Sequence, residues 1–162
     1  MSTKIHTLVD ALGNPLGFFL TPGQAHDLQG ADALLPHMKA DTLLADKAFD
    51  ADQRVIEPLQ NAGKTCVIPP KRNRKTPRPF DKEMYKARHL IENFYARLKQ
   101  FRAIATRYDK TARNFLAAIH LAAAIAWLNR GQALGYCGRR KKFRGTLAVP
   151  SGQLFVSDAL AQ

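Results

Sequence analysis

The sequence predicts an α/β fold, in which short strands alternate with helices and share one sheet. Polar and apolar residues alternate from Lys4 to Val9, and an apolar run from Leu16 to Leu20 follows the turn residues Gly13-Asn14-Pro15. This pattern is typical of a β-hairpin. Two further compact apolar runs, Thr42–Ala45 and Thr65–Ile68, have the length of strands.

Two helices are expected between these strands. Asp27 can cap a short helix that continues toward Met38. Asp50 and Gln53 have the spacing of a capping box, which predicts a second helix that Pro58 should kink. Strands and helices therefore alternate through the first 70 residues, as an α/β sheet requires.

The second half of the chain is expected to be mostly helical. Residues 71–79 have no apolar periodicity and predict an exposed loop, the basic loop. A helix is predicted over about residues 81–101, and Asp109 can cap a long apolar helix that ends near Asn129. Between these helices, residues 104–108 predict a short strand or an extended connector.

The charge balance indicates an acidic polymer as partner. The 162-residue chain has a net charge of +12 and a pI near 10.1, although its hydrophobic content of 46% is ordinary for a globular protein. The positive charge is uneven: residues 1–63 have four Lys/Arg against eight Asp/Glu, whereas residues 64–110 have fourteen against four. Nucleic acid is the first candidate for such a partner.

The tail from residue 130 to residue 162 differs from the rest of the chain. It contains five glycines and a weak apolar end without clear periodicity, so we expect a mobile segment outside a domain of residues 1–129. Two origins stay open, namely translation into flanking sequence or an extra tail that contacts nucleic acid. The second would act through a basic cluster, Arg139, Arg140, Lys141, Lys142 and Arg144.

Several classes of protein are excluded by what the sequence lacks. Cys66 and Cys137 form no CxxC pair and the histidines have no zinc-ligand spacing, so neither a disulfide framework nor a zinc site is predicted. The most apolar run, Leu116–Leu128, is too short to span a bilayer, and residues 1–20 lack the features of a signal peptide. We therefore expect a reducing, cytoplasmic setting and no membrane partner.

Four polar residues form one stripe on the predicted helix of residues 81–101. Tyr85, Arg88, Glu92 and Lys99 fall within an arc of roughly 60° at 100° per residue. Apolar residues three and four apart form the neighbouring stripe, which we expect to face the core. The polar stripe displays a carboxylate among cations, an arrangement that can hold a metal ion against a phosphate.

Asp46 is a second candidate carboxylate, because it directly follows the predicted strand Thr42–Ala45. Strand ends deliver side chains to the mouth of an α/β sheet. With Glu92 it could supply oxygen ligands to divalent ions that bind a phosphodiester. Two alternatives stay open: Asp46 as a turn or cap residue, and Glu92 as a solvated glutamate paired with a neighbouring cation.

The same residues resemble those of a known family. Tyr85, Arg88, Glu92 and Lys99 reproduce the Y-x2-R-x3-E-x6-K signature of bacterial insertion-sequence transposases with a DDE catalytic triad, and the chain looks like the insertion sequence 5 type. The likeness covers about Ser2–Asn129. Besides the signature, it rests on four segments, Ser2–His6, Ala45–Asp50, Val67–Pro70 and Arg102–Lys110.

The resemblance implies a ribonuclease H-like fold of the retroviral integrase superfamily, a mixed sheet with flanking helices. In such transposases three carboxylates hold two Mg²⁺ (or Mn²⁺) ions, and the match makes Asp46 the second carboxylate and Glu92 the third. It also implies that Tyr85, Arg88 and Lys99 grip the DNA backbone near the cleavage point. Four residues of the basic loop are expected either to be solvated or to contact DNA: Lys71, Arg72, Arg74 and Lys75.

The chain departs from the family pattern at its start. The family's first acidic residue precedes the strand that begins at Ser2, and this chain begins at Met1, so we expect the first catalytic Asp and its central strand to be missing. Asp10 is a tempting substitute, but it enters the Gly13-Asn14 turn, which favours a role in that turn. Without the central strand, the hairpin and the strand ending at Asp46 would both have unpaired edges unless another segment fills the gap.

We therefore expect a transposase that cleaves DNA and transfers strands at terminal inverted repeats, but a chain that is incomplete and inactive alone. Its expected partners are double-stranded DNA at transposon ends, further copies of the chain in an active oligomer, and a separate upstream polypeptide that supplies the missing strand. The expected location is the bacterial cytoplasm, in association with the nucleoid. The alternatives are a non-catalytic DNA-binding remnant or regulator of transposition, and a ribonuclease H-like nuclease of unrelated purpose.

Overall fold

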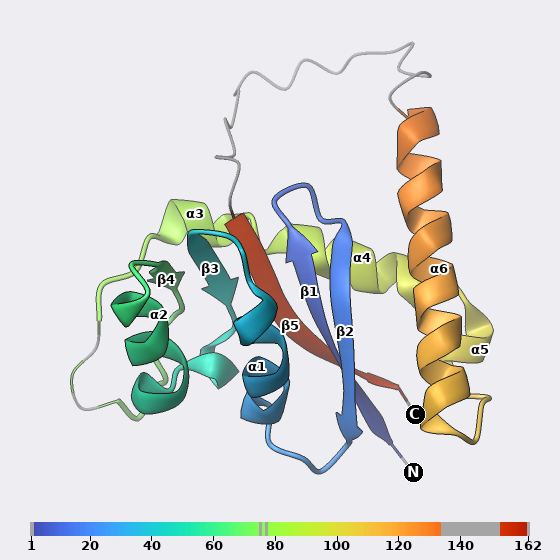
Figure 1. Cartoon of the computed structure of the whole chain (residues 1–162), viewed down its shortest axis with the longest axis horizontal. Helices are drawn as coiled ribbons and strands as arrows, with labels where there is room; N and C mark the ends of the chain where they lie inside the picture. Colours follow the sequence, from blue (N-terminus) through green and yellow to red (C-terminus); the bar gives the residue numbers. More distant parts are fainter. Residues whose placement is uncertain (1, 75, 77, 134–152, 162) are drawn as a thin grey trace.

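Figure 1 shows a mixed sheet with helices on both faces, in a computed structural model that describes residues 2–74, 76, 78–133 and 153–161. Its strands follow the order β2-β1-β5-β3-β4 across the sheet. β1 runs antiparallel to β2 and β5, whereas β3 runs parallel to β4 and β5. The strands are β1 (Thr3–Asp10), β2 (Pro15–Pro22), β3 (Thr42–Ala45), β4 (Thr65–Val67) and β5 (Gln153–Ala161).

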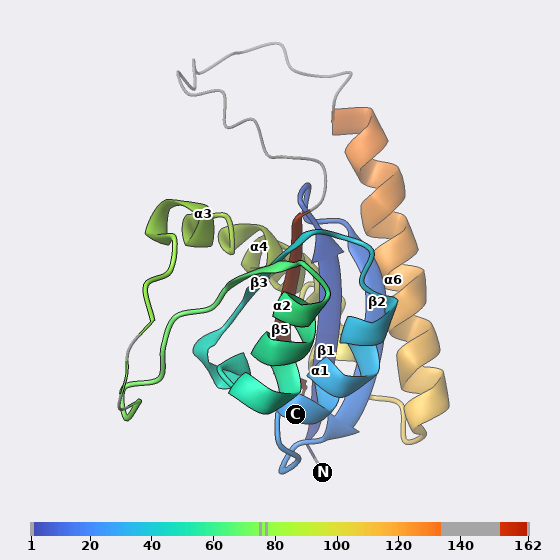
Figure 2. The same ribbon diagram turned by 60° about the vertical axis from the view of Figure 1, so that its left-hand side comes forward.

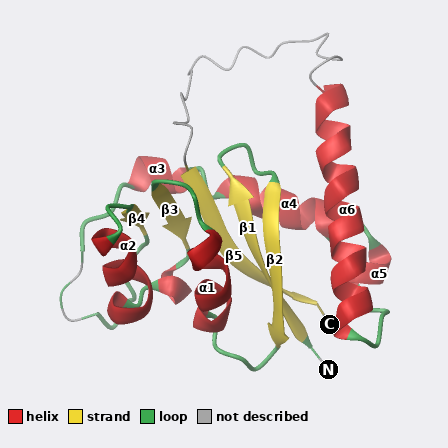
Figure 3. Cartoon of the chain, viewed as in Figure 1, coloured by secondary structure: helices red, strands yellow, loops and turns green. Residues whose placement is uncertain are grey.

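The helices fall into two groups along the chain, drawn red in Figure 3. The first group, between β2 and β4, contains α1 (Leu28–Leu34), the 3₁₀ helices η1 (Leu35–His37) and η2 (Lys47–Phe49), the π-helix η3 (Asp52–Ile56) and α2 (Glu57–Asn61). The second group follows β4 and contains α3 (Lys82–Lys86), α4 (His89–Leu98), α5 (Arg102–Ala105) and α6 (Ala112–Ala133).

Each face of the sheet buries its own apolar cluster, because successive side chains of a strand point to opposite faces. Ile5 and Val9 of β1 pack with residues of α4, α5 and α6, whereas Leu8 packs with residues of α1, η3 and α2. The turned view in Figure 2 shows α1 and α2 together on one side of the sheet and α6 on the other. Leu43 and Leu44 of β3 divide between the two clusters in the same way. The predicted α/β fold class is therefore confirmed as a sheet with two helical layers.

β5 occupies the centre of the sheet. Its backbone pairs with β1 from Thr3↔Ala161 to Asp10↔Leu154 and with β3 from Thr42↔Gln153 to Ala45↔Val156. The edges of β1 and β3 are therefore not left unpaired, since one strand of this chain fills the gap between them. Pairing also satisfies the backbone N–H and C=O groups that a gap would leave without partners.

The tail differs from its prediction in two places. No regular element was expected after Arg130, yet α6 continues to Ala133 and Gln153–Ala161 form β5. The physical reason is that a strand between two others is selected by its neighbours, whereas local sequence preference adds little. The basic cluster Arg139, Arg140, Lys141, Lys142 and Arg144 lies outside the described residues.

The hairpin is confirmed, and Asp10 has the turn role expected of it. Its Oδ1 accepts hydrogen bonds from the backbone N–H groups of Leu12 and Asn14, at 2.9 and 2.8 Å. Its Oδ2 accepts from the side-chain amide of Asn14 at 2.9 Å. Asp10 therefore stabilises the β1–β2 turn, which is the role that its place in the sequence favours.

The predicted helix of residues 81–101 is wrong as one continuous element, since it is divided into α3 and α4 at Ala87 and Arg88. Both residues keep right-handed helical dihedrals, but the N–H of Leu90 bonds to Ala87 instead of Lys86. The Nδ1–H of His89 donates to the carbonyl of Lys86 at 2.9 Å and takes the place of that backbone bond. The chain therefore tightens locally just before Glu92.

Three capping predictions are also wrong, because each side chain has other partners or another residue caps the helix. Asp27 forms an ion pair with Lys4 and makes no side-chain cap bond to α1. The helical segment expected after Asp50 is present as η3 and α2, but its N-cap is Ala51, and the Asp50 side chain accepts from the basic loop instead. Thr111, not Asp109, caps α6 through a 3.3 Å bond from the N–H of Asn114.

The connector of residues 104–108 also differs from its prediction. It was expected to be extended, but Arg102–Ala105 form α5, and the buried Ile104 packs into the cluster beneath α4 and α6. Thr106 donates its hydroxyl to the carbonyl of Arg102 at 2.8 Å, which helps to close this short helix. Burial of one apolar side chain thus outweighs the weak preference for an extended connector.

Candidate active site

Asp46 lies at the carboxyl end of β3, where the chain leaves the sheet and enters η2. Its Oδ1 accepts the N–H of Lys47 at 2.7 Å, so the carboxylate caps the first turn of η2. The side chain is 32% exposed, which leaves Oδ2 open to a second partner. The expected cap role and the expected position at the sheet mouth are therefore both present in one residue.

Arg88 joins Asp46 to Glu92 across 46 residues of sequence. Its Nη2 donates to Asp46 Oδ2 at 3.2 Å and its Nη1 donates to Glu92 Oε1 at 2.6 Å. The guanidinium is 21% exposed and the Glu92 carboxylate 58%. Asp46, Arg88 and Glu92, here the Arg88 cluster, thus hold two carboxylates around one cation, with a net charge of −1.

Tyr85 lies beside this cluster and half-buried against Phe80. The two rings meet edge to face with centroids 5.7 Å apart. Burial raises the pKa of the Tyr85 phenol above its usual value of 10.0, the charge of Arg88 lowers it, and the carboxylates of Asp46 and Glu92 raise it. Tyr85 is therefore a neutral hydroxyl at physiological pH, close enough to sense three charges.

Lys99 stands apart from the other members of the signature. It is the exposed C-cap residue of α4, seven positions after Glu92 and hence roughly 10 Å farther along the helix axis. Its side chain forms no ion pair with any residue that the structure describes. The structure thus brings together Tyr85, Arg88, Glu92 and Asp46, and places Lys99 two turns away.

The basic-loop residues that were predicted to contact DNA differ in their surroundings. Arg72 is exposed and Lys71 half-buried, and within the described chain neither side chain forms an ion pair. Arg74, in contrast, donates to Asp50 at 2.5 Å and to both carboxylate oxygens of Asp52, at 2.6 and 2.5 Å. Lys75 lies outside the described residues.

Sequence reasoning missed the residues that hold this loop. Asp50 is 1% exposed and accepts from Arg74, from Arg78 at 2.7 Å and from the N–H of Lys71 at 2.9 Å. Its spacing from Gln53 favoured a helix cap, and no local signal linked it to arginines 24 and 28 residues away. Asp50, Asp52, Arg74 and Arg78 are here the Asp50 cluster.

The Arg88 cluster has part of what a divalent metal needs. Asp46 and Glu92 supply carboxylate oxygens, the ligands that Mg²⁺ and Mn²⁺ prefer. Arg88 already places a cation between them, which is evidence that the pair attracts positive charge. Among the described residues no group of three His, Cys, Asp or Glu lies close enough to hold a metal. The donor set therefore fits one side of a metal site.

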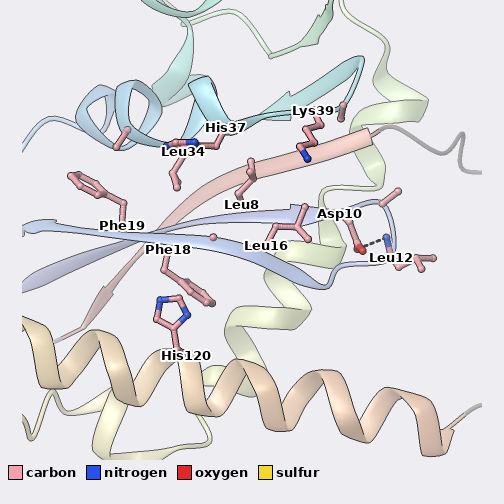
Figure 4. Close-up of a pocket in the computed structure, with 14 residues that line it drawn as sticks. Leu8, Asp10, Leu12, Leu16, Phe18, Phe19, Leu34, His37, Lys39 and His120 are labelled. Atoms are coloured by element: carbon pink, nitrogen blue, oxygen red, sulfur yellow. Dashed lines mark hydrogen bonds between the residues drawn. The ribbon is translucent and has the colours of Figure 1, made fainter.

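A groove of about 930 Å³ lies elsewhere, around the edge strand β2 (Figure 4). Phe18 faces His120 of α6 on one side, edge to face at 5.2 Å, while Phe19 points to the other side, toward the segment of Leu34. The lining is mainly apolar, and Asp10 is engaged in the hairpin turn. Neither Asp46 nor Glu92 lines it, so the groove is separate from the acidic site.

Known proteins identify the family. A model of the transposase DDE domain matches residues 1–127. The chain belongs to this transposase family. It is also 40% identical over 129 residues to a Brucella ovis protein described as "Putative transposase for insertion sequence element IS6501". That alignment covers 79% of this chain and 99% of the relative. No solved structure matches the chain.

Members of the DDE transposase family share several properties. DDE transposases are metal-dependent, bind DNA at transposon ends, and act as nucleases and strand transferases. The predicted transposase and its link to insertion sequences are therefore confirmed. No helix in the described part of the chain is long and apolar enough to cross a membrane.

Proposed function

We propose that this chain acts at the DNA ends of an insertion sequence, with the Arg88 cluster as the acidic part of its catalytic site. The observation that supports this most is the meeting of Asp46, at the end of β3, with Glu92 of α4 through a single arginine. Two like-charged carboxylates repel each other, so their meeting at one place is stabilised by a shared cation, here Arg88. The ribonuclease H-like fold implied by the resemblance places acidic residues at these strand and helix positions.

In this proposal Asp46 and Glu92 hold Mg²⁺ or Mn²⁺, which would activate water and stabilise the charge on a cleaved phosphodiester. Arg88 separates from one carboxylate and turns toward a phosphate, since guanidinium groups bind phosphate as readily as carboxylate. Tyr85 stays neutral and offers its hydroxyl as a hydrogen-bond donor to the DNA backbone. Lys99 contacts a phosphate farther along the strand, because it lies two turns along α4.

The chain is proposed to bind DNA without cutting it when alone. A full site of this family needs three carboxylates, and only two meet among the described residues. The third would come from a separate polypeptide, and the active form would be an oligomer in the bacterial cytoplasm at the nucleoid. The second candidate function, a non-catalytic regulator that occupies transposon ends, is favoured by the same lack of a third acid in the described chain.

Cleavage and binding of one duplex test whether the chain alone binds transposon ends without cutting them. The substrate carries the terminal repeats found in the DNA that flanks the gene, and a scrambled duplex is the comparison. The purified chain is expected to shift the repeat duplex in a gel and to leave it uncut in Mg²⁺ or Mn²⁺. Cutting at ordinary enzymatic rates by the chain alone would refute the proposed incompleteness.

Glu92→Gln tests the role of the acid itself. If a partner restores cutting, this variant is expected to lose at least about a hundredfold in rate, while DNA binding stays within about twofold, because a neutral amide cannot hold the metal. Glu83→Gln is the matched control: Glu83 also pairs with a cation on the neighbouring helix α3, but lies outside the Arg88 cluster. Equal losses in both variants would exclude Glu92 as a metal ligand.

A further inference from the structure

Among the described carboxylates that form ion pairs, Asp50 is the most deeply buried. It faces the basic loop. Its side chain is 1% exposed, while its arginine partners Arg74 and Arg78 are 17% and 32% exposed. Oδ1 accepts from both guanidinium groups, and Oδ2 accepts the N–H of Lys71 at 2.9 Å. One carboxylate therefore holds the loop at its start, its middle and its end.

Asp52 is the second carboxylate that pairs with the two arginines of the loop. It binds Arg74 through both carboxylate oxygens and lies 3.6 Å from Arg78. Two carboxylates thus neutralise two guanidinium groups within the Asp50 cluster. Hydrogen bonds from Arg74 hold the pKa of Asp52 below its usual value of 3.8, as expected for a carboxylate that stays ionised in this contact.

The loop residues that face solvent are different from the loop residues that attach it to the rest of the domain. Among its described residues, Arg72 is exposed and Lys71 half-buried, and the charges of both side chains are unpaired. The loop is attached next to the candidate catalytic acid, because Asp46 and Asp50 are the N-cap and C-cap of the single-turn helix η2. The unpaired charges are therefore held near the Arg88 cluster.

We propose that Asp50 is a positioning residue that holds the basic loop as a preformed phosphate-binding arm, with Arg74 and Arg78 as tethers and Lys71 and Arg72 as the phosphate contacts. This rests on the proposed DNA function. It divides the predicted DNA-binding residues into two roles. An ordered loop binds DNA more tightly than a free one, because its conformational entropy is already lost before DNA arrives.

Asp50→Asn gives a test in which simple charge and positioning predict opposite signs. The substitution makes the chain more positive by one charge, so electrostatics alone predicts tighter DNA binding. Positioning predicts binding weaker by roughly fivefold to tenfold, because the released loop must be ordered again on DNA. Asp32→Asn is the matched control, since it makes the same charge change at an exposed ion pair with Arg54, which is not one of the contacts of the Asp50 cluster.

The affinity of each variant for a repeat duplex is measured by fluorescence anisotropy, with circular dichroism as the check of folding. Weaker binding by Asp50→Asn, together with equal or tighter binding by Asp32→Asn, is the expected result. Equal strengthening in both variants would overturn the positioning role.

A second pair of variants keeps the proposal testable if Asp50→Asn does not fold. Arg72→Gln is expected to lower the slope of log affinity against log salt by about 0.9, because one phosphate contact is lost. Arg74→Gln is expected to weaken binding while leaving that slope unchanged, since its charge is already neutralised by Asp50 and Asp52. The same loss of slope in both variants would make Arg74 a phosphate ligand and overturn the division of roles.

Loop order is read without DNA by limited trypsin cleavage after Lys71 and Arg72. Cleavage is expected to be at least about tenfold faster in Asp50→Asn than in the unchanged chain, and unaltered in Asp32→Asn. If the unchanged chain bound no DNA, the proposed function would fail whatever the cleavage rates. If it bound DNA normally and Asp50→Asn changed neither cleavage nor affinity, only the positioning role would fail.

Discussion

The two acid–arginine clusters at either end of η2 differ in burial and in charge. The Arg88 cluster has two carboxylates and one guanidinium, and its Glu92 carboxylate is 58% exposed. The Asp50 cluster has two carboxylates and two guanidinium groups, and its central Asp50 is 1% exposed. The residues are of the same types, and four positions separate Asp46 from Asp50.

The difference indicates which cluster can exchange its partners. A cluster with an excess negative charge at the surface can accept another cation at small cost, because water screens both its present pair and its replacement. A neutral cluster around a buried carboxylate cannot exchange its partners so easily. An arginine that left the cluster would leave behind a buried carboxylate charge that water cannot reach. This difference supports the proposals that the first cluster binds a metal ion and the second attaches the loop.

The largest expected effect is on folding stability. Asp50→Ala is expected to lower the free energy of unfolding by about 2–4 kcal/mol, because two partly buried guanidinium groups lose their shared buried carboxylate and keep only the half-exposed Asp52. Asp46→Ala removes a half-exposed pair and a short helix cap, and is expected to cost about 1 kcal/mol or less. Urea denaturation followed by circular dichroism measures both. Equal costs would erase the distinction between the clusters.

The next effect is on binding of Mn²⁺, measured by electron paramagnetic resonance with the metal alone. Arg88→Gln is expected to tighten binding by roughly threefold to tenfold, because it removes the cation that competes for Asp46 and Glu92. Glu92→Gln is expected to weaken binding at least about tenfold. Asp50→Asn serves as the control and should leave Mn²⁺ binding unchanged. Weaker binding in Arg88→Gln would mean that Arg88 orders the acids for the metal.

The smallest expected effects are on the pH dependence of folding stability. One effect falls at acid pH and the other at alkaline pH. Asp52 has a pKa lowered by Arg74, so its stabilisation is present above about pH 3.8 and is lost as the pH falls through its folded pKa. Burial raises the pKa of Tyr85 above 10.0, so its contribution is present below pH 10 and is lost as the pH rises through the folded pKa.

Two substitutions check these assignments. Arg74→Gln should return the pKa of Asp52 toward 3.8 in an NMR titration, and Tyr85→Phe should remove a late-titrating phenol from the alkaline absorbance curve. An unchanged Asp52 midpoint in Arg74→Gln would show that this ion pair does not form in solution.

Local patterns were sufficient for the residues that act near their own strand or helix. The β1–β2 hairpin and β3 were predicted because alternation and turn residues act over a few positions. The approach of Arg88 to Glu92 followed from helical spacing, which survives the tightened turn at Ala87 and Arg88. Asp46 was found because a carboxylate directly after a buried strand is visible in sequence.

Distant contacts decided what the sequence did not predict. Asp50 was assigned to a helix cap because its true partners, Arg74 and Arg78, lie 24 and 28 residues away. The break between α3 and α4 depends on the ring of His89, whose bond to Lys86 has no signature in spacing. The place of β5 depends on two strands more than 100 residues earlier, and its own residues have little strand pattern.

The central position of β5 has a consequence for how the protein is made. The two strands on either side of it leave the ribosome early, while β5 follows β3 by 108 residues. At about 5–20 residues per second, translation leaves β1 and β3 without their shared neighbour for roughly 5 to 20 s. During that time the open strand edges are exposed to chaperones, nascent neighbours and proteases. The sheet closes only after β5 has been made, so a ribosome that stalls before β5 releases a chain whose sheet is incomplete.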